Sequence, residues 1–145
     1  MIICRVPRAV RAGAVALALA AVLSSCYSSP RGEALQLLNQ DRTSRGVPAL
    51  GSHGQLDAKA QAWAERLARE NRIYHSNLSS GITACWRSLG ENVGYGSSVA
   101  QVQAAYMNSS PHRANILNRS FDRVGVGVAY NGSRVFTVQV FMDAC

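Results

Sequence analysis

Three short segments of this chain carry side chains that exchange protons or bind metal ions. They are His75 in YHSN, Glu91 in LGENVGYG and His112 in SPHRANIL. Near neutral pH an imidazole acts as a base, an acid or a metal ligand, and a carboxylate beside it takes part in the same proton transfers. The three residues are close enough in the sequence for one fold to bring them into one cleft.

Each of the three also has an ordinary structural explanation. His75 comes at the expected end of a long helix, where a surface or capping histidine is common. Glu91 lies in an expected loop flanked by glycines, where its carboxylate can accept backbone N–H bonds. His112 follows Pro111 in a first helical turn, where the helix dipole disfavours a protonated ring. The neutral ring can act as a base or ligand, or bond to a nearby carbonyl.

The helices are expected in the part of the chain before residue 118. Residues 55–72 repeat apolar side chains at the spacing of an amphipathic helix, with Trp63 in the stripe that faces the core. Serines at 97–98 and at 109–110 are suited to cap two later helices. We expect helices at 33–44, 55–72, 99–107 and from Pro111 to 117, and an irregular segment at 73–90.

The period changes near the end of the chain, where strands are expected. Valines alternate with Gly125 and Gly127 over 124–130, an Asn-Gly turn follows, and 134–142 is rich in β-branched and aromatic residues. Two glycines on one strand face leave room for a helix to pack closely. Helices followed by an antiparallel sheet predict a compact, layered α+β fold.

The first residues have the pattern of an export signal. Arg5, Arg8 and Arg11 precede an apolar run at 13–23, which is too short to span a membrane. The run ends in LSSC, which resembles the lipobox in which a cysteine, here Cys26, is lipidated and becomes the mature N-terminus. Ordinary cleavage nearby, leaving a free cysteine, is the alternative. A lipidated Cys26 would anchor the domain to the outer face of a membrane.

The remaining cysteines predict one disulfide. Cys4 leaves with the signal and Cys26 takes the lipid, so Cys85 and Cys145 form an even pair in an oxidising compartment. Closing so long a loop is worth about 4 kcal/mol in the chain-entropy model. Two unpaired thiols are the alternative. Without a CxxC motif, these cysteines do not suggest a structural zinc site.

Charge and length limit the class of protein. The net charge is +7, but three of the fifteen basic residues lie in the leader, and the others are scattered. This pattern argues against a nucleic-acid surface. The expected organisation is a signal at 1–25, a tether at 26–32 and one domain at 33–145, which we expect to be a monomer.

Read together, the motifs resemble those of a known family, the bacterial branch of the CAP superfamily. This superfamily comprises cysteine-rich secretory, antigen 5 and pathogenesis-related 1 proteins, and its domain is also called SCP. The resemblance covers about residues 35–141 and implies a three-layer α-β-α sandwich with a small antiparallel sheet. It is carried by HS at His75, GEN at Glu91, Tyr106, SxPHRANI at His112, GVGV at 125–128 and QVF at 139–141.

The resemblance also implies a cleft. Eukaryotic members place two His and two Glu there, and His75, His112 and Glu91 match three of these. Ser109 lies near the place of the fourth, so the set is incomplete. Two imidazoles and a carboxylate leave room for a divalent cation such as zinc, although the missing carboxylate weakens that site.

Three further residues match the motif and are interpreted as supporting the cleft. Asn92 is expected to bond to loop backbone, Arg113 to pair with a carboxylate on the core side, and Asn115 to serve a structural purpose. Tyr106 takes the place of the family's more usual Trp and is expected in the core.

Three functions remain open from the sequence. The first is a ligand-binding module outside the cytoplasm, for a lipid, a sterol-like molecule or a cell-envelope fragment. The second is a hydrolase in which Glu91 or a histidine activates water, with or without a bound metal ion. The chain has no GxSxG or HExxH motif. Helix capping explains Ser109 and Ser110 more simply than a nucleophilic role. The third is a structural protein whose motif residues only hold loops together.

Overall fold

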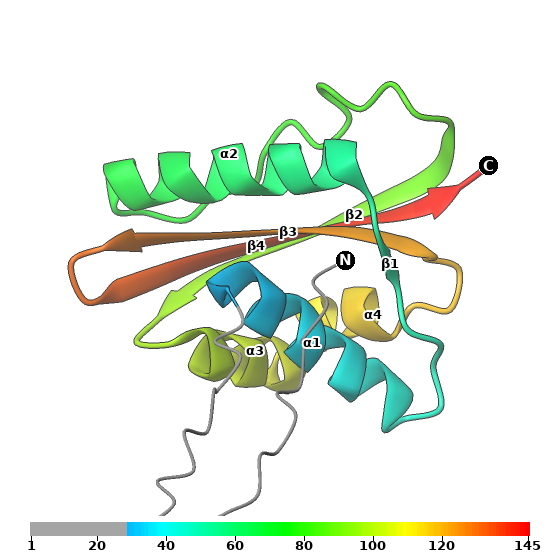
Figure 1. Ribbon diagram of the computed structural model, residues 1–145, viewed down its shortest axis with the longest axis horizontal. Helices are drawn as coiled ribbons and strands as arrows, with labels where there is room; N and C mark the ends of the chain where they lie inside the picture. Colours follow the sequence, from blue (N-terminus) through cyan, green and yellow to red (C-terminus); the bar gives the residue numbers. More distant parts are fainter. Residues whose placement is uncertain (1–28) are drawn as a thin grey trace, which may run out of the picture.

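The computed structural model describes residues 29–145, so the predicted leader and Cys26 lie outside the described part. One sheet lies between two helical layers, with α2 alone on one face and α1, α3 and α4 on the other (Figure 1). The predicted three-layer sandwich is therefore confirmed. The elements are α1 (Pro30–Thr43), β1 (Gly51–Ser52), α2 (Gly54–Glu70), β2 (Trp86–Gly96), α3 (Val99–Asn108), α4 (Ser110–Leu117), β3 (Arg123–Asn131) and β4 (Arg134–Ala144).

The sheet has the strand order β1-β3-β4-β2. The three long strands are antiparallel, with Gly125 and Glu91 both opposite Val140 on β4. The two-residue β1 adds a parallel pair with β3 that the sequence did not predict. β2 is thus an edge strand.

Two elements differ from the expectations. Residues 73–90 and the segment around Glu91 were expected to be irregular, but β2 occupies 86–96. Its glycines and polar residues have low strand propensity, and pairing along β4 overrides that preference. α1 begins at Pro30, inside the predicted tether, because the Ser29 side chain accepts a bond from Gly32 N (3.1 Å) and proline suits a first helical turn.

Helix α2 packs directly against β3 at the two glycines. A Cβ atom added at Gly125 would lie 2.0 Å from the carbonyl carbon of Leu56, and one at Gly127 would lie 2.1 Å from the carbonyl oxygen of Ala60. The close packing predicted from these glycines is confirmed. Asp57 from the same helix also accepts a bond from the β3 backbone, at Val126 N (3.2 Å).

The opposite layer is held partly by a buried arginine. Arg42 of α1 is 1% exposed. Its guanidinium donates to four backbone carbonyls, and these belong to Pro48, Ile116, Asn118 and Phe121. Since buried charges are stable only when they are hydrogen-bonded, this arrangement joins α1 to the end of α4 and the segment after it.

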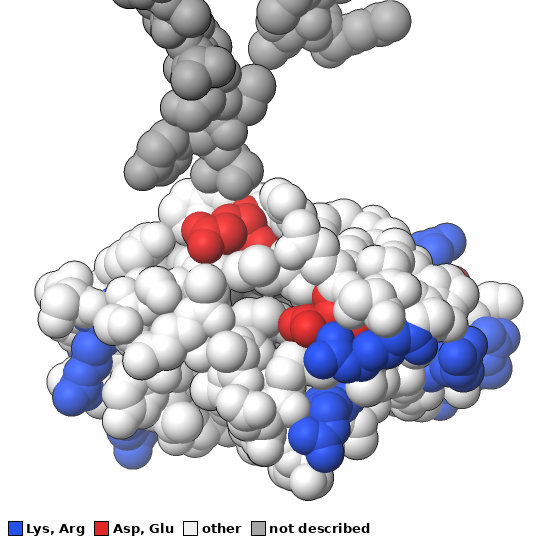
Figure 2. Space-filling view, turned by 90° about the horizontal axis from the view of Figure 1, so that it is seen from below, with Lys and Arg blue, Asp and Glu red and all other residues white. Residues whose placement is uncertain are grey.

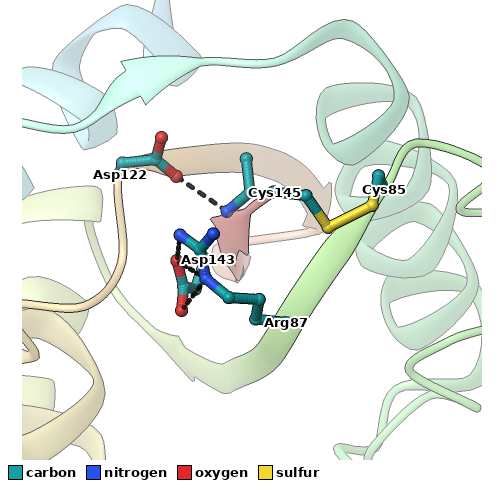
Figure 3. Close-up of a disulfide and its surroundings, with 6 residues drawn as sticks. Cys85, Arg87, Asp122, Asp143 and Cys145 are labelled. Carbon is teal, nitrogen blue, oxygen red and sulfur yellow. Dashed lines mark hydrogen bonds and ion pairs between the residues drawn. A yellow bond between two sulfur atoms is a disulfide. The ribbon is translucent and has the colours of Figure 1, made fainter.

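The predicted disulfide between Cys85 and Cys145 is present, with the two Cα atoms 5.4 Å apart. Figure 3 shows it where β2 begins and β4 ends, beside the Arg87 guanidinium, which donates to both carboxylate oxygens of Asp143. The backbone adds a bond from Cys145 N to Cys85 O (3.2 Å). The chain end is therefore fixed to the edge strand that carries Glu91.

Two surface properties bear on partners. In the part of the chain that the structure describes, no helix has the length and apolar character needed to cross a bilayer. On the face seen in Figure 2, the Lys and Arg side chains lie in separate groups with uncharged surface between them. That face does not show the continuous basic stripe that typifies a nucleic-acid surface.

Candidate functional site at the edge of β2

Neighbouring residues of the GEN motif serve opposite faces of the sheet. Leu89 and Val93 belong to the core beneath α2. Because side chains alternate along a strand, Glu91 points to that same face and Asn92 points to the face of α3 and α4. The edge strand β2 therefore contributes to both helical layers at one point.

The Glu91 carboxylate is buried and fully engaged. Its side chain is 2% exposed. It accepts bonds from Ser76 N (2.9 Å), Ser76 Oγ (2.6 Å) and His75 Nδ1 (2.8 Å). These donors replace water around the carboxylate charge. The backbone N–H bond foreseen for Glu91 is present, together with a contact to His75.

His75 is the exposed member of this pair. Its side chain is 63% exposed, and because Nδ1 faces Glu91, the opposite nitrogen, Nε2, is free of that contact. The preceding Tyr74 is fixed as well, since Trp63 Nε1 donates to its carbonyl (3.0 Å) and the two rings meet edge to face. The bond to Glu91 therefore fixes the orientation of the imidazole, while most of the ring remains exposed to solvent.

His112 reaches the same region from the other layer. It lies in the first turn of α4, with its ring 5.1 Å from that of Tyr106. Burial lowers the pKa of His112, and the charge of His75 lowers it further. A neutral imidazole was foreseen from the helix dipole, whereas here burial is the first cause. Its backbone is held by Asn92, whose Nδ2 donates to the His112 carbonyl (3.1 Å).

A chain of buried amides continues from Asn92 through the core. Asn92 Nδ2 donates to Gln139 Oε1 (3.0 Å), and Gln139 Nε2 donates to Gln103 Oε1 (2.8 Å). Gln103 Nε2 then donates to Asp41 Oδ2 (2.8 Å). On the site side, Asn115 Nδ2 donates to Asn92 Oδ1 (2.9 Å). Gln103 and Gln139 were not predicted from the sequence; the signal for Gln139 was a polar residue inside an apolar strand.

The other predicted supporting residues have mixed outcomes. Within residues 29–145, Arg113 pairs with no carboxylate. Its Nη1 donates to the Met107 carbonyl (2.8 Å), which links the end of α3 to α4. Asn92 bonds to backbone, but its partner is the His112 carbonyl in α4 and not the expected loop backbone. Ser109 occupies the N-cap position of α4, yet its side chain makes no capping bond. Tyr106 is in the core as expected.

The residues present do not form a complete metal site. Among residues 29–145, no three His, Cys, Asp or Glu side chains lie together so as to hold one ion. The Glu91 carboxylate is occupied by its three donors, so its arrangement orients His75, as outer-shell carboxylates do for histidine. His75 and His112 alone supply two protein ligands, fewer than the three of catalytic zinc sites and the four of structural ones.

Comparison with known proteins agrees with this architecture. The model of the cysteine-rich secretory protein family, CAP, matches residues 35–141. The chain belongs to the CAP family. Its match with the uncharacterized protein YkwD of Bacillus subtilis is 29% identical over 118 residues, covering 75% of this chain and 46% of that protein. The chain thus spans about half the length of this curated relative.

Two solved structures show the same fold. An outer surface protein from Borrelia burgdorferi superposes with a TM-score of 0.66 at 18% identity, over 77% of this chain and 90% of that one. An extracellular SCP-domain protein from Bacillus anthracis gives 0.65 at 24% identity, over 78% of this chain and 40% of that one. At these identities the likeness concerns the fold.

Proposed function

We propose that this CAP domain is an extracytoplasmic binding module that takes an apolar or cell-envelope ligand at the edge of β2. The observation that carries the proposal is that the exposed His75 imidazole is oriented by a bond from Nδ1 to the buried Glu91 carboxylate. A ring fixed in this way loses little freedom on binding, which favours affinity. Ser109 and His112, at the start of α4, would form the opposite side of the site.

The chemistry of the site indicates which ligand groups it would bind. Because His75 Nδ1 donates to the Glu91 carboxylate, Nε2 of the neutral ring accepts a hydrogen bond, and it donates one only when the ring is protonated. The neutral His112 ring beside Tyr106 offers a mostly apolar contact with one polar nitrogen. A ligand with a hydroxyl or amide next to an apolar part fits both groups. Peptidoglycan fragments, lipids and sterol-like molecules carry such groups.

Location outside the cytoplasm is part of the proposal. It is supported by the leader pattern, by the Cys85–Cys145 disulfide and by the extracellular SCP protein of similar fold. Lipidation of Cys26 would keep the domain at the membrane. Cell fractionation tests this anchor: the wild type should be found with membranes and Cys26→Ser in the soluble fraction. A soluble wild type would contradict the anchor without touching the binding proposal.

Binding can be tested on the histidine ring signals by NMR. Soluble peptidoglycan fragments and, separately, a phospholipid are titrated into the mature domain, and the His75 and His112 resonances are followed. We expect saturable shifts that are lost in His75→Ala and greatly weakened in His112→Ala. His53→Ala, which changes the remaining histidine, is the matched control and should bind normally. If the shifts saturate with neither the peptidoglycan fragments nor the phospholipid, the proposal is wrong.

A hydrolase is the second candidate, and one observation favours it. A carboxylate on Nδ1 of an imidazole is the arrangement that orients a general base, and Glu91 and His75 form that pair. The same titration samples are analysed for cleavage products. Turnover that is lost in Glu91→Gln would favour the hydrolase. If neither ligand class is bound or cleaved, and Glu91→Gln only lowers the stability of the domain, the structural alternative is correct.

A further inference from the structure

We propose that the groove between α2 and residues 76–81 is a separate binding site for a small organic anion, one with an apolar body and a single carboxylate or phosphate group. The groove has a volume of about 640 Å³, which is in the range of small-molecule sites. It shares Ser76 with the β2-edge site, but it does not depend on any function of that site. Its lining is formed by α2 on one side and by the segment after Ser76 on the other.

The α2 side of the groove offers a rigid apolar wall. Ala58, Ala62 and Trp63 line it. The indole of Trp63 is fixed by its bond to the Tyr74 carbonyl (3.0 Å), and the Arg66 guanidinium lies 5.2 Å from the ring centroid. Because this wall is already ordered, an apolar body placed against it gains burial with little cost in side-chain entropy.

The charged residues of the groove are all basic. Lys59, Arg66 and Arg69 line it, and no Asp or Glu is among its lining residues. Arg66 pairs with Glu70, with Nε 3.0 Å from Oε1, and Glu70 also pairs with Arg72. Within residues 29–145, Arg69 forms no ion pair or side-chain hydrogen bond, so its charge is available to a ligand.

Lys59 places a second cation within the groove. Its Nζ donates to the carbonyls of Asn77 (2.8 Å) and Ser80 (2.9 Å). An ammonium has three donors, so one N–H remains for a ligand. Burial lowers the pKa of Lys59, and the charge of the nearby Glu91 opposes that change. An anion in the groove would further favour the charged ammonium.

The site fits a single molecule better than a membrane surface. Recognition of anionic membranes uses clusters of about four to eight basic residues. In the described part of the chain, Lys59 and Arg69 are the groove's only basic residues without a carboxylate partner. These two sit beside a concave apolar wall, which matches a molecule with one charged end. An extended anionic surface could not follow that concavity.

The test uses octyl phosphate as the probe and the fluorescence of Trp63. Trp86→Phe removes the other tryptophan, so the signal reports the groove alone. We expect saturable quenching by octyl phosphate. Inorganic phosphate lacks the apolar body and so loses the apolar burial. Octyltrimethylammonium lacks the anion and so loses the charge-assisted contact. Each should therefore bind at least about tenfold more weakly.

Variants separate specific binding from non-specific adsorption. Arg69→Gln should weaken octyl phosphate about tenfold without affecting folding, because Arg69 has no partner to lose among the described residues. Lys59→Gln should weaken the binding of octyl phosphate similarly. Arg134 lies beside Tyr95 and outside the groove lining, so Arg134→Gln is the matched control and should bind normally. His75→Ala should leave this binding unchanged, which distinguishes failure here from failure at the β2 edge.

Two results would overturn the proposal. Equal affinity for octyl phosphate and octyltrimethylammonium would show that the groove takes any apolar chain. The groove is not the site of a single organic anion if Arg69→Gln leaves the affinity for octyl phosphate unchanged. The same conclusion follows if the protein responds only to vesicles of anionic phospholipid and not to the monomeric probe.

Discussion

The two faces of the sheet are closed in different ways. On the α2 face, the Gly125 and Gly127 positions are so close to the helix that an added Cβ would overlap its backbone. On the opposite face, the equivalent contact at Gly94 is with the Tyr106 side chain, and a chain of buried amides runs between the layers. The α2 face is specified mainly by shape, although Asp57 and Gln61 also bond to the β3 backbone. The opposite face contains the buried amide chain, which holds the backbone of His112.

The largest effect is expected on the face that is specified by shape. Gly127→Ala should lower the free energy of unfolding by about 3 kcal/mol or more, because α2 or β3 must move as a unit to admit the methyl group. Gly94→Ala should cost less, about 1 to 2 kcal/mol, because a ring can shift further than a helix backbone. Urea unfolding measures both.

Gly54→Ala is the matched control for these two variants. An added Cβ at Gly54 would meet no atom within 4 Å, and alanine in a first helical turn should be neutral or stabilising by up to about 1 kcal/mol. If Gly94→Ala proved as costly as Gly127→Ala, the contrast between the two faces would be lost.

A somewhat smaller effect is expected from the amide chain. Gln139→Leu leaves the Gln103 carbonyl oxygen without its donor, and should cost about 2 kcal/mol. The double variant Gln139→Leu/Gln103→Leu should lose less stability than the sum of the two single variants, because it also removes the unpaired Gln103 carbonyl oxygen. Gln40→Leu, on the exposed side of α1, should stay within about 0.5 kcal/mol. Strict additivity would mean that the amides do not act as a chain.

The smallest effect concerns pH. Burial, followed by the charge of His75, lowers the pKa of His112 in the folded protein. The unfolded chain therefore binds this proton more readily, so His112 should make stability rise with pH up to its ordinary pKa of about 6.5. Below that pH the contribution is progressively lost. His112→Asn should flatten this part of the urea midpoint profile, and identical profiles would mean that His112 is solvated.

The sequence predicted the elements whose pattern is local. Alternating valines indicated β3, and the spacing of apolar residues indicated α2 together with the close approach at Gly125 and Gly127. β2 was missed because its strand character comes from pairing with β4 and not from its own glycine-rich segment. The bond between His75 and Glu91 joins two segments across the fold, so motif order indicated that they belong together without showing which atoms meet.

The amide chain was beyond sequence reasoning for a related reason. Gln103 lies on a helix and Gln139 on a strand, and only the packing of the layers brings their amides together. Gln139 in an apolar run signalled a buried polar group that needs a partner. Nothing local identified that partner.

The buried Arg42 has a mechanical consequence for a domain held at its N-terminal side. Force applied ahead of Pro30 enters the fold through α1, and the guanidinium passes it on to the carbonyls of Ile116, Asn118 and Phe121. α1 cannot be peeled away alone, because its departure would strip donors from several buried acceptors at once. Strain on a tether would therefore be shared by α1, the end of α4 and the segment that leads into β3.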